Sequence, residues 1–294
     1  MLWKKVTLIG VGLLGGSLGL ALRQKRLAGT VVGFVRRKAS LAECRKFGAV
    51  DTVTLDLRQA VADAELVILC APISQMLGLT RRLLPALKRG AIVTDVGSAK
   101  DSVVRELEPL VAKAGAHFVG SHPMAGSEKT GVRAARADLF QNAICVVTPT
   151  TKSDKSAVRQ VERLWRAVGA RTIRLTPARH DALVSRSSHL PHVVAVALAN
   201  HVLDPARPKG QALLCADGFR DTTRIASGSP EMWRDIALAN RKHLRAALDD
   251  FVRELQRVQA ILREGDADGL ARLFEAAKAR RDRWSARATS PAPE

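Results

Sequence analysis

The chain has 294 residues, 47% of them hydrophobic and 26% charged, and its 47 basic and 28 acidic side chains give a formal net charge of +19. The apolar share excludes wholesale disorder, and the length allows one large domain or two medium ones, each with its own core. Four scattered cysteines without a CxxC pair exclude a disulfide scaffold and a structural zinc finger, and they favour the reducing cytoplasm.

The elements expected along the chain fall into two groups. Short apolar runs predict strands at 6–9, 31–34, 66–70, 92–95, 118–120, 144–148 and 172–175. Amphipathic stretches predict helices at 15–25, 74–87, 100–114 and 155–168, and later at 191–202, 230–260 and 268–286. In the long helix, one face is expected to be buried because apolar residues recur every three or four positions: Leu244, Leu248, Phe251, Val252, Leu255 and Val258.

This order predicts an α/β fold with a doubly wound, mostly parallel sheet in residues 1–175, followed by an all-α domain in residues 176–288. The helical domain is expected to bind substrate and to dimerise. Residues 289–294 are expected to form a frayed tail.

The positive charge is spread over both domains. Residues 1–150 hold 21 basic and 11 acidic side chains, and residues 151–294 hold 26 and 17, so the two parts carry +10 and +9. No block or aromatic-interleaved stripe concentrates the charge, so we expect no nucleic-acid partner. The N-terminal apolar run, 6–22, is short for a membrane span and lacks a small-residue cleavage site, so we expect no membrane association.

A glycine-rich turn follows the first predicted strand. Gly10, Gly12 and Gly15 match G-x-G-x-x-G between a strand and a helix, which is typical of a Rossmann-like dinucleotide-binding domain. Gly10 permits the tight turn, Gly12 admits a pyrophosphate, and Gly15 allows close helix packing. The other residues expected at the cofactor are Leu13, Leu14, Ala71 and Pro72.

The end of the second strand indicates which cofactor is preferred. An NAD enzyme usually carries an acidic residue there for the ribose 2′-hydroxyl, but this chain has Arg36, Arg37 and Lys38. An arginine fork suits a 2′-phosphate. The sequence therefore predicts a preference for NADP, with NAD left as the alternative.

Three further motifs carry polar side chains that suit a reaction centre. DVGSAK, with Ser98, and SHPMAGSE, with His122, each follow a strand, so we expect both residues to face the nicotinamide. The helical half holds SHLPH and GFRDTTRI, which contain His189, His192 and Arg224.

Together these motifs resemble the prephenate/arogenate dehydrogenase family of tyrosine biosynthesis. The resemblance covers nearly the whole chain, with GxGxxG, DVGSAK, SHPMAGSE, SHLPH, GFRDTTRI and PEMW in the same order. It implies oxidative decarboxylation of a cyclohexadienyl substrate with hydride transfer to NAD(P)+. The products would be 4-hydroxyphenylpyruvate from prephenate, or tyrosine from arogenate, together with CO2. It also implies a homodimer built on the helical domain.

The resemblance further implies roles for single residues. His122 would be the base that takes the proton of the 4-hydroxyl group, and Ser98 would orient His122 or that hydroxyl. Arg224 would bind a substrate carboxylate. The remaining residues expected at the substrate are Glu128, which would pair with Arg224, Ser121, His189, His192 and Trp233.

Other interpretations stay open at this point. His189 and Trp233 also fit structural packing, and Arg220 with Asp221 also fits a solvated pair. We expect no metal, because no Cys, Asp or Glu completes a ligand set with the HxxH histidines. A β-hydroxyacid or imine reductase would explain the architecture but leaves SHPMAGSE and GFRDTTRI without a role. A nucleotide-sensing or nucleic-acid-binding protein is favoured only by the charge, and the sequence does not separate prephenate from arogenate.

Overall fold

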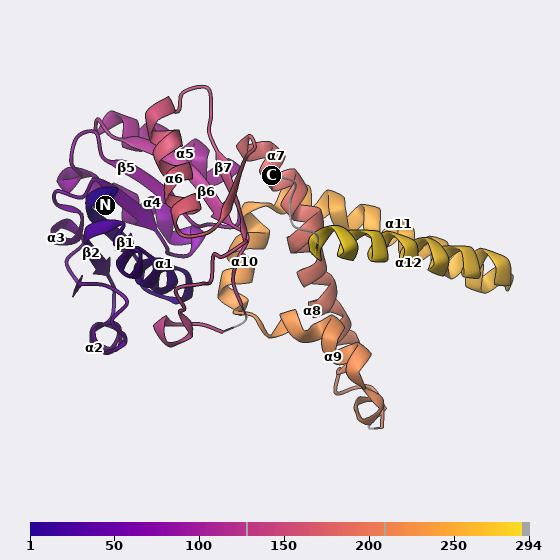
Figure 1. Cartoon of the computed structure of the whole chain (residues 1–294). Helices are drawn as coiled ribbons and strands as arrows, with labels where there is room; N and C mark the ends of the chain where they lie inside the picture. The colour runs from indigo at the N-terminus through magenta and orange to yellow at the C-terminus, as the bar shows by residue number, and fades with distance from the viewer. Residues whose placement is uncertain (128, 209, 290–294) are drawn as a thin grey trace. The chain divides into compact units, whose positions relative to one another are not determined.

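The computed structural model describes residues 1–127, 129–208 and 210–289, and it divides the chain into two compact units, Met1–Leu244 and Arg245–Glu294. The first unit is built on an eight-stranded sheet (Figure 1). Its strands are β1 Trp3–Ile9, β2 Ala28–Phe34, β3 Thr52–Thr54, β4 Leu66–Leu69, β5 Ile92–Asp95, β6 His117–Pro123, β7 Ile144–Thr148 and β8 Arg171–Arg174.

The sheet has the order β3-β2-β1-β4-β5-β6-β7-β8, and every neighbouring pair is parallel except β6 and β7. This confirms the predicted doubly wound, mostly parallel sheet. The order reverses direction between β1 and β4, where open sheets of this kind bind their ligands. The strand that the sequence did not predict, β3, is three residues long with threonine at both ends.

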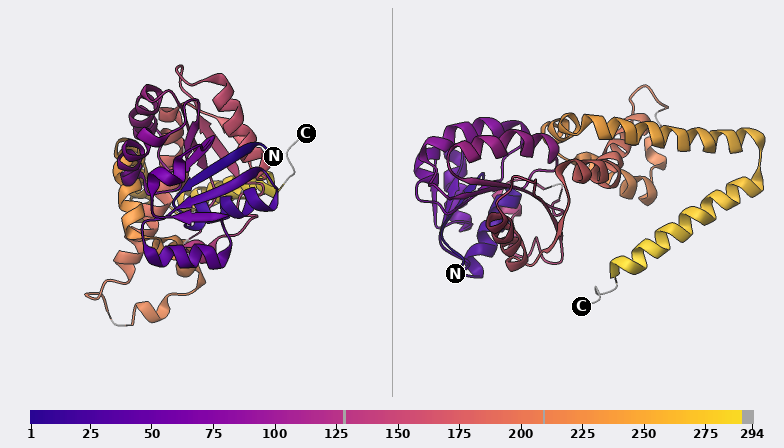
Figure 2. Two further views of the ribbon diagram at one scale, coloured as in Figure 1. Left: turned by 90° about the vertical axis from the view of Figure 1, so that its left-hand side faces the viewer. Right: turned by 90° about the horizontal axis from the view of Figure 1, so that it is seen from above.

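Helices cover both faces of the sheet (Figure 2). They are α1 Leu13–Gln24, α2 Lys38–Phe47, α3 Leu57–Val61, α4 Ile73–Leu83, α5 Asp101–Lys113 and α6 Lys155–Ala167. Alternate strand residues point to opposite faces, so Leu8 packs into one core cluster with Leu18 and Trp165, while Ile9 packs into the other with Met76. The near-continuous burial of β1 and β4 follows from this two-sided cover.

The C-terminal part of the first unit, from Pro177 onward, is helical, as predicted. It contains α7 Pro177–Val184, a π-helical turn η3 Ser185–His189, α8 Leu190–Val202, α9 Asp217–Thr223, a 3-10 turn η5 Arg224–Ser227 and α10 Pro230–Ala239. No residue separates α7, η3 and α8, so they form one continuous helical segment with a π turn inside it. Such turns occur often at functional sites.

The single long helix predicted for 230–260 is wrong. α10 ends at Ala239, and a separate helix, α11 Arg241–Glu264, follows Asn240. Asn240 is buried, and its side-chain amide donates to the backbone oxygen of Asp181 at 2.8 Å. Because asparagine competes well for backbone groups, this tertiary hydrogen bond overrides the helical pattern at that residue.

The second unit contains most of α11 and the helix α12 Ala267–Thr289, which diverge from a turn at Gly265 (Figure 2). The apolar face predicted to be buried on α11 is covered at Leu244, but Val252 and Leu255 are 47% and 49% exposed. That expectation is therefore wrong for the single chain. α12 continues to Thr289, the first residue of the expected frayed tail, and residues 290–294 lie outside the described part.

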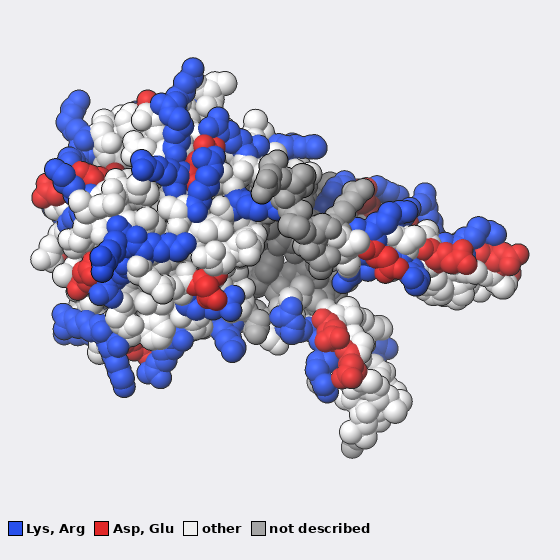
Figure 3. Space-filling view, viewed as in Figure 1, with Lys and Arg blue, Asp and Glu red and all other residues white. Residues whose placement is uncertain are grey.

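Surface charge and helix length in the described residues bear on possible partners. Figure 3 shows lysine and arginine side chains scattered over the viewed face of the α/β part rather than gathered in one patch. In the three described ranges, no helix is both long enough and apolar enough to span a membrane.

Candidate active site

The glycine-rich turn after β1 has the shape of a phosphate cradle. Gly10 has a φ of +104°, and a Cβ atom there would lie 2.7 Å from the backbone oxygen of Cys70. A Cβ on Gly15 would lie 2.0 Å from the Gly10 oxygen, so both positions require glycine. A Cβ on Gly12, in contrast, would meet nothing within 4 Å. The open space beside Gly12 therefore fits a pyrophosphate at the N-terminus of α1.

The other predicted cofactor residues border the same edge of the sheet. Leu13 and Leu14 form the half-buried first turn of α1. Ala71 lies in the loop after β4, and Pro72 occupies the N-cap position of α4. Because Ile9 of β1 is paired in register with Leu69 of β4, these two loops flank the point where the strand order reverses.

Basic side chains follow β2. Arg36 is exposed, and Arg37 occupies the N-cap position of α2 in an extended conformation. The nearby acids are engaged elsewhere: Asp51 accepts from Arg23 and from the Val31 backbone, and Asp56 caps α3.

His122 lies near the carboxyl end of β6 and is 6% exposed. Its Nδ1 is 2.8 Å from Nε2 of His180, and Nδ1 of His180 is 2.7 Å from Oδ1 of Asp181. Burial, with smaller contributions from His180, Lys100 and His189, holds the pKa of His122 well below its usual range. His122 is therefore neutral near pH 7, as a proton acceptor must be.

A buried ion pair lies beside β6 and bonds to Ser121, the residue before His122. Lys100 and Asp95 are 0% exposed, and the ammonium contacts the Asp95 carboxylate and donates to the Ser121 backbone oxygen at 3.0 Å. The Ser121 hydroxyl bonds to the Asp95 backbone oxygen at 2.6 Å and accepts from the Trp165 indole at 3.0 Å. Ser121 was expected at the substrate, but its hydroxyl is fully buried and engaged within the core, so that expectation is corrected.

Two further histidines and a tryptophan form a ring cluster beside η3. His192 stacks on Trp233 with ring centroids 3.4 Å apart and planes 9° apart, and His189 meets the edge of Trp233 at 6.2 Å. Within the described residues, His192 Nδ1 and His189 Nε2 are buried without hydrogen-bond partners. The Asn240 amide approaches Nδ1 of His189 at 3.2 Å. Burial lowers the pKa of His189 to about 4 and also lowers that of His192.

The structure places the remaining predicted residues as follows. Ser98 is half-buried in the loop after β5, and its backbone lies beside His189, whereas the ring of His122 is hydrogen-bonded to His180. Arg224 begins η5, which packs against α8, the helix that carries His192. Glu128 lies outside the described residues.

Sequence reasoning missed several of these buried groups. The sequence predicted no role for His180, Asp181, Lys100, Asp95 or Asn240. The signal that was available is the adjacent pair His180-Asp181, a histidine directly followed by an acid within a helix. Nothing in the sequence shows that this pair faces a residue 58 positions earlier.

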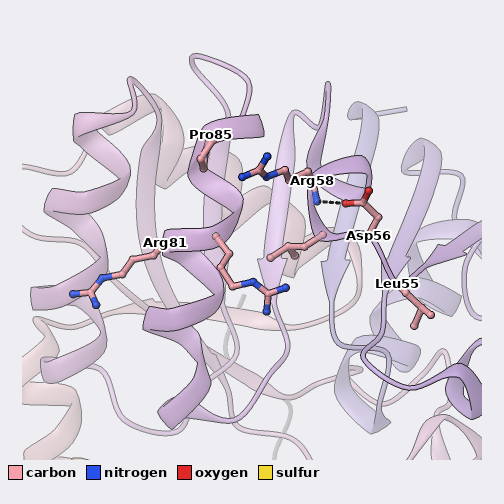
Figure 4. A pocket seen from close by; sticks show the side chains of 7 residues that line it. Leu55, Asp56, Arg58, Arg81 and Pro85 are labelled. Atoms are coloured by element: carbon pink, nitrogen blue, oxygen red, sulfur yellow. Dashed lines mark hydrogen bonds between the residues drawn. The ribbon is translucent and has the colours of Figure 1, made fainter.

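Two further features bear on ligand binding. Over the described ranges, no group of three or more His, Cys, Asp or Glu side chains is arranged to hold a metal ion. A cavity of about 780 Å³ lies between residues 55–58 and α4 with its following turn (Figure 4). It is lined by Leu55, Asp56, Leu57, Arg58, Arg81, Arg82 and Pro85, and none of these is a predicted site residue.

The glycine cradle at the strand-order reversal, together with the neutral His122, defines a nicotinamide-dependent dehydrogenase. Two family models specify which one. Residues 18–174 match the nucleotide-binding domain of prephenate dehydrogenase, and residues 176–276 match its dimerization domain. The chain belongs to the prephenate dehydrogenase family.

Individual relatives agree with this assignment. The chain is 36% identical to the prephenate dehydrogenase of Bacillus subtilis (strain 168), over 94% of this chain and 75% of the relative. It is 33% identical to a cyclohexadienyl dehydrogenase of Zymomonas mobilis, over 95% of both. The crystal structure of the A. aeolicus prephenate dehydrogenase, in complex with hydroxyphenyl propionate and NAD+, superposes with a TM-score of 0.87. It is 32% identical, over 95% of this chain and 98% of that one.

Proposed function

We propose that this chain oxidatively decarboxylates a cyclohexadienyl substrate, prephenate or arogenate, with His122 as the base and a preference for NADP as the hydride acceptor. The observation that carries the proposal is the buried, neutral His122, which lies near the carboxyl end of β6 in a chain of this family. The reductase and nucleotide-sensing interpretations give no role to the second family match over residues 176–276.

The chemistry assigned to this chain's residues follows from the substrate. The bound nicotinamide supplies the hydride acceptor. As the hydride leaves the ring carbon that bears the 4-hydroxyl group, that hydroxyl becomes strongly acidic and His122 takes its proton. The ring carboxylate then leaves as CO2, its bonding electrons aromatise the ring, and the phenol oxygen regains a proton. Arg224, at the start of η5, is assigned to a substrate carboxylate.

The direct test crosses two substrates with two cofactors. Reduced nicotinamide is followed by its absorbance with prephenate and with arogenate, each with NADP+ and with NAD+. We expect turnover with at least one substrate, and its kcat/KM identifies which side chain, keto acid or amino acid, the site prefers. The absence of turnover in all four combinations would refute the proposal.

The preference for NADP is supported by the basic side chains after β2. Arg36 and Arg37 lie where an NAD enzyme usually carries an acid, and Arg37 occupies the N-cap position of a ten-residue helix whose N-terminus favours an anion. Replacing both arginines with Ala should raise the KM for NADP+ by at least about tenfold while that for NAD+ changes little. Arg58, an exposed arginine of α3, serves as the matched control. A higher kcat/KM with NAD+ in the unmutated chain would contradict the preference.

We also propose that the chain is a homodimer formed through its helical part. The family model over residues 176–276 is a dimerization domain, and α11 leaves Val252 and Leu255 about half exposed. A second copy would bury this apolar face, since isolated chains rarely expose such a stripe. Light scattering should report twice the chain mass, and Leu255→Asp should shift it toward the monomer. A monomeric unmutated chain at assay concentration would contradict the proposal.

A further inference from the structure

A series of hydrogen bonds runs from Asp181 through His180 to His122. We propose that Asp181 and His180 are positioning residues that hold His122 in the tautomer with its proton on Nδ1 and its lone pair on Nε2. The inference rests on the proposed function only in naming the substrate hydroxyl that Nε2 serves.

The direction of each bond follows from what its atoms can donate. A carboxylate oxygen only accepts, so Nδ1 of His180, 2.7 Å from Oδ1 of Asp181, must carry the proton. A neutral imidazole has one ring proton, so Nε2 of His180 is bare and accepts from Nδ1 of His122 at 2.8 Å. Nε2 of His122 then keeps its lone pair. It makes no hydrogen bond within the described residues, and His122 as a whole is 6% exposed, whereas His189 is 1% exposed.

Asp181 is fixed so firmly that it can serve as the anchor of this series. It is 1% exposed, and its two carboxylate oxygens accept from the backbone N–H groups of Lys100 at 2.8 Å and Asp101 at 2.9 Å. Burial alone would raise the pKa of Asp181, but the bonds from His180 and from these N–H groups outweigh it and hold the pKa below its usual value. The anchor is therefore ionised, and hydrogen bonds hold both of its carboxylate oxygens.

The surroundings keep His180 neutral, as the deduction requires. Burial lowers the pKa of His180, Lys100 lowers it further, and Asp181 and Asp95 oppose the shift. A doubly protonated His180 would donate to Nδ1 of His122 and would force the His122 proton onto Nε2, which would remove the base. The deduced tautomer and a protonated His180 are thus mutually exclusive.

The other titratable groups around His122 come from three elements. Lys100 and Asp95 belong to β5 and its following loop, His189 to η3, and Cys145 to β7. Lys100 is paired with Asp95, so the pair adds little net charge, and no carboxylate other than Asp181 is hydrogen-bonded to either ring among the described residues. Only the Asp181–His180 couple can therefore select the tautomer.

The same series of hydrogen bonds accounts for the proton that moves during the reaction. Nε2 takes the hydroxyl proton while the C–H electron pair leaves as hydride, which gives an imidazolium whose Nδ1–H still donates to His180. After CO2 leaves, the same Nε2 returns that proton to the phenolate oxygen, and His122 is neutral again. Throughout, Asp181 stays ionised and His180 keeps its single proton.

Nitrogen NMR tests the tautomer in the free enzyme, without substrate. We label the full chain with 15N-histidine and assign the His122 signals as those lost in His122→Asn. Near neutral pH, we expect the 15N chemical shift of His122 Nδ1 to be that of a protonated ring nitrogen. The 15N chemical shift of Nε2 should be that of an unprotonated one. The opposite pattern, or an averaged one, would overturn the proposal.

Two substitutions at His180 test whether its hydrogen bonds, rather than the space that it fills, determine the orientation of His122. The carbonyl of Gln can accept from Nδ1 of His122 and its amide can donate to Asp181, whereas Leu fills similar space and does neither. We expect His180→Leu to lower kcat about 10²-fold with little change in KM and to lose the tautomer signature. We expect His180→Gln to retain both, with kcat within about tenfold of the unmutated chain. Equal kcat in the Leu and Gln variants would overturn the proposal.

A control substitution in the same helical segment tests whether a change there disturbs the fold in general. Ser185 lies four residues beyond Asp181, and among the described residues its hydroxyl bonds only to the Ala182 backbone. Ser185→Ala should therefore leave kcat and the NMR pattern unchanged. The two proposals fail in different ways. If the tautomer is found but no cyclohexadienyl substrate is turned over, the proposed function fails and the tautomer assignment stands; a wrong tautomer in an active enzyme refutes only the inference.

Discussion

The buried histidine cluster makes folding stability depend on pH, and His189 gives the sharpest case. It is 1% exposed, and burial lowers its pKa from 6.5 to about 4, although Asp181 pulls in the opposite direction. Between these two values the unfolded chain binds a proton that the folded chain excludes. The stability that neutral His189 provides is therefore complete above pH 6.5 and is lost as the pH falls toward 4.

The size of the loss follows from the two pKa values. At 1.36 kcal/mol per pKa unit, His189 alone should cost about 2 kcal/mol of unfolding free energy by about pH 5 and about 3 kcal/mol by about pH 4. The matching variant is His189→Gln, because a Gln carbonyl can still accept from the Asn240 amide. Urea unfolding followed by tryptophan fluorescence at about pH 8 and about pH 5 measures both chains.

We expect the unmutated chain to lose about 2 kcal/mol more than His189→Gln between those two pH values. Comparing each chain with itself cancels the packing cost of the substitution at high pH. His201→Gln changes an exposed histidine of α8 and should behave as the unmutated chain does. Parallel losses in the unmutated and His189→Gln chains, within about 0.5 kcal/mol, would refute the assignment of a buried neutral ring.

Four other expected outcomes concern the site. His122→Asn should lower kcat by about 10²–10⁴ in steady-state assays while substrate KM changes little; an unchanged kcat would remove His122 from the mechanism. Arg224→Ala should raise the substrate KM, and a change confined to the cofactor KM would contradict its assignment. Lys100→Met leaves the Asp95 carboxylate buried without its cation and should cost about 3–5 kcal/mol in urea titrations, part of which Asp95→Asn should recover; strictly additive losses would refute the coupling. Because the pKa of His122 lies below its usual range, the acidic limb of kcat/KM against pH should fall below pH 6.5, and a limb above that value would contradict a buried neutral base.

The central strands were predictable because β4 and β5 are buried along their whole length and stand out as apolar runs. β3 was not, since Val53 is its one apolar residue and its pairing with β2 supplies the rest of its stability. The break at Asn240 was equally hidden, because the Asp181 carbonyl that binds its amide lies 59 positions away. Local pattern thus gives the elements, while hydrogen bonds between distant segments decide where some of them end.

In the candidate site, too, local features were predictable from the sequence and contacts between distant residues were not. The glycine spacing could be read directly because it reflects local backbone geometry, as the close approaches at Gly10 and Gly15 show. Ser121 was misassigned because a motif gives the order of residues but not the direction of side chains. In a strand, neighbours point to opposite faces, so His122 and Ser121 cannot both face one pocket.

The low pKa of His122 raises the question of how so weak a base can serve this reaction. A base works best when its pKa is close to the pH of operation, and burial moves His122 away from that optimum. The substrate hydroxyl, however, does not stay weakly acidic, because departure of the hydride turns it into the O–H of a protonated ketone. A weak base then suffices, provided that its lone pair already faces the oxygen when the hydride leaves. Preparing that lone pair is what the Asp181–His180 couple does, so orientation of His122 matters more here than its basicity.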